Sequence, residues 1–116
     1  MPISPTVTLG VRCANATSAA LEASHVVSAA ACRVVQINAY NDKASAQYIQ
    51  LHDAATLPAD TAVPVYTISV PTKTAVLITW GMYGRHNSTG AVVCNSSTAA
   101  TKTIGSADCW FDVQYR

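Results

Sequence analysis

Apolar and polar residues alternate along most of this chain, and that alternation constrains its fold more than any other feature. A repeat of two residues is typical of a half-buried β-strand, because successive side chains point to opposite faces of a sheet. Val35, Ile37 and Ala39 share one face of such a run, and Ile49 and Leu51 share one face of the next. The pattern predicts strands at residues 6–11, 33–40, 46–53, 65–70, 74–80, 91–94 and 109–115.

Turn-forming segments separate these predicted strands. The polar residues 41–43 favour a turn that joins the second and third runs as a β-hairpin. Pro64 and Pro71 mark both ends of the run at 65–70, because proline cannot donate a hydrogen bond within a sheet. Residues 54–62 and 81–90 are predicted to be loops.

One domain of residues 6–116, preceded by an extended arm at residues 1–5, accounts for the whole length. Within it, residues 14–31 are ambiguous: residues 19–23 fit one or two helical turns, and residues 25–27 fit a short strand. The predicted fold is all-β, an antiparallel β-sandwich of seven or eight strands.

The charge content excludes several classes of partner. The 116 residues include seven Lys and Arg and six Asp and Glu, and the basic residues form no cluster in the sequence, so we expect no binding to nucleic acid. No apolar stretch is long enough for a transmembrane helix, so we expect no membrane association. The first residues lack the regions of a secretory signal. We therefore expect a chain that stays in the cytoplasm that makes it, leaves by lysis, or has lost a signal.

Four cysteines, Cys13, Cys32, Cys94 and Cys109, allow three pairings, and none forms the close-spaced pair of a zinc site. A symmetric hairpin centred between Cys94 and Cys109 would place these two opposite each other, where a disulfide is geometrically allowed. The alternative, that all four are reduced and buried, is favoured because no secretion signal is present.

No catalytic constellation is visible in the sequence. His52 and Asp53 are adjacent and therefore point to opposite faces of a strand. A single Glu and five scattered Asp give no carboxylate pair, so we expect no enzyme activity, no cofactor and no metal. Three glycosylation sequons begin at Asn15, Asn87 and Asn95, and we interpret them as polar turns.

The low charge favours a surface that other subunits cover. Thirteen charges over roughly 6,000 Å² give a free monomer little protection against self-association. The alternative is that Ser and Thr hydroxyls keep the chain soluble. The proline-rich arm and the loop at residues 80–86 contain residue types that anchor interfaces. The candidate interface residues are Pro2, Ile3, Pro5, Trp80, Met82, Tyr83, Arg85 and His86.

Three runs, at residues 38–41, 46–54 and 63–71, resemble small β-sandwich virion proteins of tailed bacteriophages. In that group a strand ends in Asn at a turn, as at Asn41. A strand with the pattern Tyr-x-x-Leu-x-Asp follows, and then a strand that begins and ends with proline. The group includes capsid cement or decoration proteins, which are jelly-roll-like and commonly dimeric or trimeric, and also fibre- and tail-associated proteins.

The resemblance implies a non-enzymatic decoration protein on the capsid surface of the virion, made in the host cytoplasm. It would bind the major capsid protein and stabilise its lattice as a homodimer or homotrimer. The alternative is a host-recognition or glycan-binding module of a fibre or tail, with Trp80, Tyr83 or Trp110 stacking on the ligand. A third hypothesis is a secreted, disulfide-linked, adhesin-like domain.

Overall fold

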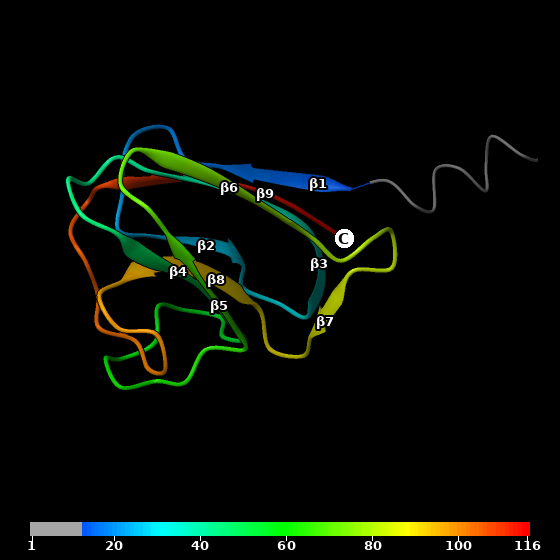
Figure 1. Cartoon of the computed structure of the whole chain (residues 1–116). Coiled ribbons are helices and arrows are strands. Elements are labelled where there is room, and N and C mark those ends of the chain that lie inside the picture. The colour runs from blue at the N-terminus through cyan, green and yellow to red at the C-terminus, as the bar shows by residue number, and fades with distance from the viewer. Residues whose placement is uncertain (1–12) are drawn as a thin grey trace, which may run out of the picture.

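The computed structural model describes residues 13–116, which form two antiparallel β-sheets packed face to face (Figure 1). Within this part of the chain there is no helix with the length and apolarity needed to cross a membrane. The strands are β1 (Ala14–Thr17), β2 (Ser24–Ser28), β3 (Cys32–Asn41), β4 (Gln47–His52), β5 (Tyr66–Val70), β6 (Thr74–Thr79), β7 (Arg85–Asn87), β8 (Ala91–Ser96) and β9 (Cys109–Tyr115).

The all-β antiparallel sandwich predicted from the sequence is confirmed, with more strands than expected. Residues 14–31 form the two strands β1 and β2, and β7 lies inside the predicted loop at 81–90. The predicted strand at 6–11 and the arm at 1–5, with Pro2, Ile3 and Pro5, lie outside the described residues.

Most successive strands lie in different sheets, although the consecutive strands β4 and β5 pair with each other. Sheet A has the order β1-β9-β3-β6, with β7 also paired to β3, and sheet B has the order β2-β8-β4-β5. The predicted hairpin of 33–40 with 46–53 is therefore wrong, because β3 lies in sheet A and β4 in sheet B. Each of these strands has an apolar face, and crossing between the sheets turns the two faces toward each other.

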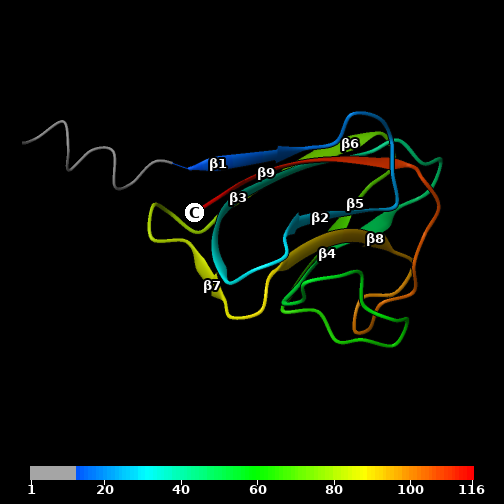
Figure 2. The same cartoon turned by 180° about the vertical axis from the view of Figure 1, so that it is seen from behind.

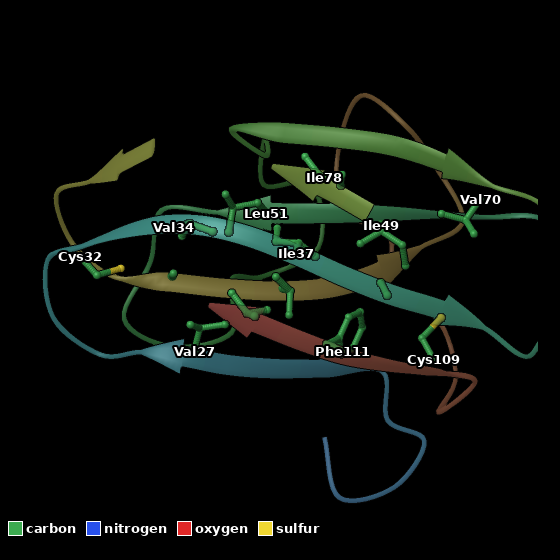
Figure 3. Packing of buried hydrophobic residues seen from close by; sticks show 14 residues of the cluster. Val27, Cys32, Val34, Ile37, Ile49, Leu51, Val70, Ile78, Cys109 and Phe111 are labelled. Atoms are coloured by element: carbon green, nitrogen blue, oxygen red, sulfur yellow. The ribbon is translucent and has the colours of Figure 1, made fainter. Parts of the chain in front are cut away.

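The core fills the space between the two inner faces (Figure 3). A β-bulge between Val34 and Gln36 shifts the alternation, so that Val34 and not Val35 belongs to the core. Phe111 on β9 is the largest fully buried side chain. The cluster consists of Val27, Cys32, Val34, Ile37, Ala39, Ile49, Leu51, Val70, Ile78, Ala91, Val93, Cys109, Phe111 and Val113.

The carboxylate of Asp53 fixes the connection between β7 and β8. It accepts hydrogen bonds from the backbone N–H groups of Ser88, Thr89 and Gly90, at 3.1, 2.9 and 3.2 Å. These bonds, that from Thr89 above all, hold the pKa of Asp53 below its usual value. A Cβ atom on Gly90 would lie 2.5 Å from the carbonyl oxygen of Ala54, so only glycine fits this turn.

We predict that Asp53→Asn lowers the free energy of unfolding by about 1–3 kcal/mol at pH 7, because an amide accepts these bonds less well than a carboxylate. The folded pKa lies below the unfolded value of about 3.9, so the stabilisation is present above that pH and is lost as the pH falls through the folded pKa. Urea denaturation should show a gap between variant and natural protein that narrows below about pH 4. Asp112→Asn, which removes a carboxylate bonded by side chains of the exposed sheet face, is the control. Equal stability of Asp53→Asn and the natural protein at pH 7 would contradict the prediction.

Candidate functional site

The outer faces of the two sheets differ in what covers them. The loops that follow β4 and β8 both lie over the outer face of sheet B, and neither covers the outer face of sheet A (Figures 1 and 2). We call the outward side of β1, β9, β3, β6 and β7 the open face. Because one surface of sheet A is left uncovered by these loops, the open face is the candidate functional site.

Side chains on the open face lie in four cross-strand rows that the strand register defines. Directly opposite residues on antiparallel strands point to the same face, with Cβ atoms about 4.5–5.5 Å apart. The chemistry changes along the strands, from aromatic through uncharged polar to cationic. The first row holds Trp110, Tyr40 and Ala75, the second Thr17, Asp112, Asn38 and Leu77, the third Asn15, Gln114, Gln36 and Thr79, and the fourth Arg116, Arg33 and His86.

The aromatic row borders a cavity. The rings of Tyr40 and Trp110 stack with centroids 6.3 Å apart and planes 29° apart. A cavity of about 420 Å³ lies at the other end of the face, whereas the cavity beside Trp110 measures about 390 Å³ and is lined by residues 17–21, Trp110 and Asp112. This end of the open face therefore places an indole, a carboxylate and hydroxyl groups around one hollow.

The two middle rows present almost no charge. Their one ionisable side chain, Asp112, accepts hydrogen bonds from Asn15 Nδ2 at 3.2 Å and Thr17 Oγ1 at 3.0 Å. Leu77 on the edge strand β6 is 61% exposed and adds an apolar contact. Amide and hydroxyl groups both donate and accept hydrogen bonds, so this surface can pair with the polar atoms of a partner without opposite charges.

The loop predicted as an interface is only partly available for one. The Trp80 ring packs edge-on against Tyr66, 5.3 Å between centroids, at the margin of the core. Met82 and Tyr83 are 59% and 77% exposed. Arg85 and His86 belong to β7, and His86 is a member of the fourth row.

Several residues of the open face were not singled out from the sequence, among them Tyr40, Arg33 and Arg116. The sequence feature that could have identified them is the set of side chains that point outward from the strands at 33–40 and 109–115. These side chains are polar or aromatic. What the sequence lacks is the register, which pairs Arg33 with a residue at the far end of the chain.

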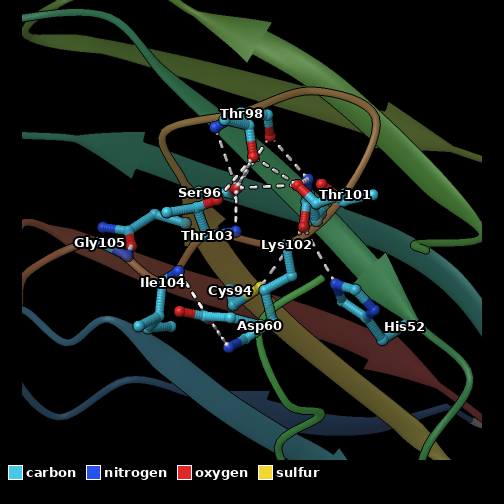
Figure 4. Close-up of polar contacts among 12 residues, drawn as sticks. His52, Asp60, Cys94, Ser96, Thr98, Thr101, Lys102, Thr103, Ile104 and Gly105 are labelled. Carbon is cyan, nitrogen blue, oxygen red and sulfur yellow. Dashed lines mark hydrogen bonds and ion pairs between the residues drawn. The ribbon is translucent and has the colours of Figure 1, made fainter. Parts of the chain in front are cut away.

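A buried polar cluster lies on the opposite side of the molecule, under the loops of sheet B (Figure 4). The Gln50 amide donates to the carbonyl oxygens of Thr98 and Thr101, at 2.9 and 3.2 Å, and its Oε1 lies 3.0 Å from His52 Nε2. Lys102 is only 2% exposed, and its Nζ donates to Asp60 Oδ1 at 2.8 Å. The cluster fixes both loops to the sheet.

Two ionisable groups of this cluster, Cys94 and His52, are shifted toward their neutral forms. Burial raises the pKa of the Cys94 thiol to about 11. Burial, and then the charge of Lys102, lower the pKa of the His52 imidazole. His52 and Cys94 each contact Gln50, the thiol sulfur at 4.0 Å from Oε1. A protonated thiol and a neutral imidazole beside the Gln50 amide suit a structural role, which is to hold the loops on sheet B.

The cysteines and sequons are placed as follows. Cys94 and Cys109 lie on strands of different sheets, so the hairpin expected to bring them together does not form. All four thiols are free, but the expectation that all four are buried is wrong for Cys13, which is exposed. Asn87 and Asn95 are buried, with side chains that donate to backbone oxygens, whereas Asn15 is exposed on β1. Residues 13–116 nowhere gather three side chains that could hold a metal ion.

Comparison with protein families, curated proteins and solved structures gave no match for this chain. The resemblance to small virion proteins therefore rests on the residues at 38–71 alone.

We predict that His52 makes stability depend on pH. Its folded pKa lies below the unfolded value of about 6.5, so the stability it contributes is present above that pH and is lost as the pH falls through the folded pKa. His52→Gln keeps a donor toward Gln50 but does not titrate. In chemical denaturation, the variant should therefore lose less stability than the natural protein between pH 7.5 and pH 5. Parallel pH profiles of the two proteins would contradict the prediction.

Proposed function

We propose that this protein is a non-enzymatic structural protein of a bacteriophage virion, which decorates the capsid by binding the major capsid protein through its open face. The observation that carries the proposal is the difference between the two sheets. The chain covers the outer face of sheet B with its own loops and leaves the outer face of sheet A uncovered. The middle of that face has hydrogen-bonding groups and little charge, which suits a permanent contact with another protein subunit.

The strand order supports the jelly-roll form of the sandwich. With the short β7 set aside, each sheet has four strands, β1-β9-β3-β6 and β2-β8-β4-β5, and successive strands alternate between the sheets except at β4 and β5. Jelly rolls occur in viral capsid and lectin domains. This is an argument by fold analogy, and the contact surface itself has to carry the function.

The size of the open face favours binding by several copies. Four strands about 4.8 Å apart and about seven residues of 3.3 Å each give a projected area of roughly 450 Å². Stable protein interfaces bury about 800 Å² on each partner. A homodimer or homotrimer on a symmetry axis of the shell would gain affinity from simultaneous contacts.

The expected mechanism is mass action. A subunit that binds the assembled lattice but not its free components stabilises the lattice by its binding free energy. No reaction step and no cofactor enters this mechanism. On this proposal the protein acts at the capsid surface after it is made in the host cytoplasm.

We predict that the purified protein raises the temperature at which shells lacking it release their contents. Leu77→Glu should weaken shell binding about tenfold or more, because the interface would bury an unpaired charge. Val63→Glu is the matched control, because Val63 is 75% exposed in the loop over sheet B. Sedimentation with shells and heat challenge measure both effects. Absence of binding by the natural protein, or equal loss in both variants, would overturn the proposal.

A second candidate function, glycan binding by a fibre- or tail-associated host-recognition module, is favoured by the aromatic row. A flat indole beside a cavity with carboxylate and hydroxyl groups is suited to a sugar ring, which stacks through its apolar face and hydrogen-bonds through its edge. Trp110 is the stacking residue that the geometry favours, because the Trp80 ring packs against Tyr66.

For this second function we predict that Trp110→Ala abolishes binding on a glycan array, whereas folded Trp80→Ala retains it. Trp80→Ala serves as control because it removes the other indole, at the margin of the core. A glycan signal that survives Trp110→Ala, or no signal from the natural protein, would exclude the aromatic row as a sugar site.

A further inference from the structure

The fourth row of the open face brings three basic side chains together from three strands. Arg33 on β3 lies opposite His86 on β7. On its other side Arg33 exchanges both backbone hydrogen bonds with Arg116, at 2.8 Å each, one residue past the end of β9. Paired residues of antiparallel strands point to the same face, so two guanidinium groups and an imidazole stand side by side. We call these three residues the cationic row.

No Asp or Glu side chain pairs with the cationic row. All six Asp and Glu side chains lie in the described part of the chain, and each has other partners. Like charges directly opposite each other destabilise a sheet, so the row lowers stability unless an anion binds it. The carboxylates are engaged as follows: Glu22 with His25, Asp42 with Lys73, Asp60 with Lys102, Asp108 with Lys43, Asp53 with the backbone at 88–90, and Asp112 with Asn15 and Thr17.

A cavity of about 420 Å³ opens at the cationic row and is lined by Ala31, Cys32 and the three basic residues. The small side chain of Ala31 leaves room beside the guanidinium groups, whereas the Cys32 side chain points into the core. The Nε–H of Arg116 is buried and has no acceptor within residues 13–116, and no side-chain hydrogen bond uses its terminal nitrogens there. The only side-chain hydrogen bond of Arg33 in this region is a long one, 3.5 Å from Nη1 to the carbonyl oxygen of Tyr83. Most of the donors in the row are therefore left for a ligand.

The loop before β7 holds this arrangement in place. Gly84 has a φ of 70°, and a Cβ atom there would lie 3.1 Å from the Cβ of Arg33 and 3.0 Å from the carbonyl oxygen of Val34. Only glycine lets the loop pass this close to β3 in that conformation. The close approach sets the Tyr83 carbonyl against the Arg33 guanidinium and so orients it.

We propose that the cationic row binds a phosphate group. A phosphate carries a charge of about −1.5 to −2 at neutral pH, which two guanidinium groups can neutralise. Its oxygens accept paired N–H bonds from the planar fork of arginine. The site stands on the geometry of the row and does not depend on the proposed virion role. Both a free phosphate ion and a phosphate monoester on a larger molecule offer this chemistry.

The test is a titration of the full chain with inorganic phosphate at constant ionic strength, with a titration of chloride as the reference. NMR amide resonances of residues 31–33, 86 and 116 report the binding. We expect saturable shifts at these positions. Arg33→Gln should weaken phosphate binding at least about tenfold, and Arg33→Lys should fall between, because lysine keeps the charge but loses the fork. Lys43→Gln, which removes a half-buried charge elsewhere, should bind phosphate as the natural protein does.

A parallel titration with glycerol 3-phosphate distinguishes the two sources. Equal affinity for both ligands identifies a site for the free ion, and clearly tighter binding of the monoester identifies a group carried on a larger molecule.

Thermal unfolding of the variants shows whether a loss of phosphate binding is caused by a loss of the folded structure. Without phosphate, Arg33→Gln should melt at the same or a higher temperature than the natural protein, because the substitution relieves repulsion within the row. With phosphate, only the natural protein should gain. The proposal is overturned by absence of saturable shifts, by unchanged binding in Arg33→Gln, by equal loss in Lys43→Gln, or by a lower melting temperature of phosphate-free Arg33→Gln.

Discussion

The apolar layer between the two sheets is the interaction on which the rest of the structure depends. Phe111 and Val113 of sheet A meet Ile49 and Leu51 of sheet B there, and burying aliphatic and aromatic side chains of this size contributes roughly 1.5–3 kcal/mol each. Because every long strand has one face in that layer, its other face must point outward. The protein therefore has two outer faces. Loops cover one of them and leave the other open, so only one face is available to a partner.

The loops on the outer face of sheet B are held by buried hydrogen bonds and an ion pair rather than by a second apolar layer. The side chains of Gln50 and Lys102 are buried, and hydrogen bonds from them hold the two loops on sheet B. Buried polar groups are costly when unpaired, so such a cluster accepts few alternative loop positions. The other outer face has no such cover. Its polar side chains remain available to a partner instead of being used by the chain itself.

The alternation of residues predicted most of the strands. For β4 it also predicted which side chains point into the core: Ile49 and Leu51 do, whereas Gln50 and His52 point away from it. It did not predict which strands pair, because local periodicity says nothing about partners far apart in the sequence. The strand β7 was missed because three residues are too few to show a period. Lys102 was missed because a lysine in a Ser- and Thr-rich segment is typical of an exposed loop, and only the approach of Asp60 explains its burial.

The same limit explains why the basic residues were predicted to form no cluster. Arg33, His86 and Arg116 are far apart in the sequence, and only the pairing of β3 with β7 and β9 places them in one row. A chain with so few charges gains nothing in stability from setting two arginines side by side, since neighbouring opposite charges would be the stabilising arrangement. An unfavourable arrangement held by a well-packed sheet is better explained by a bound ligand than by folding. The cationic row therefore carries information about function that the charge count of the chain does not contain.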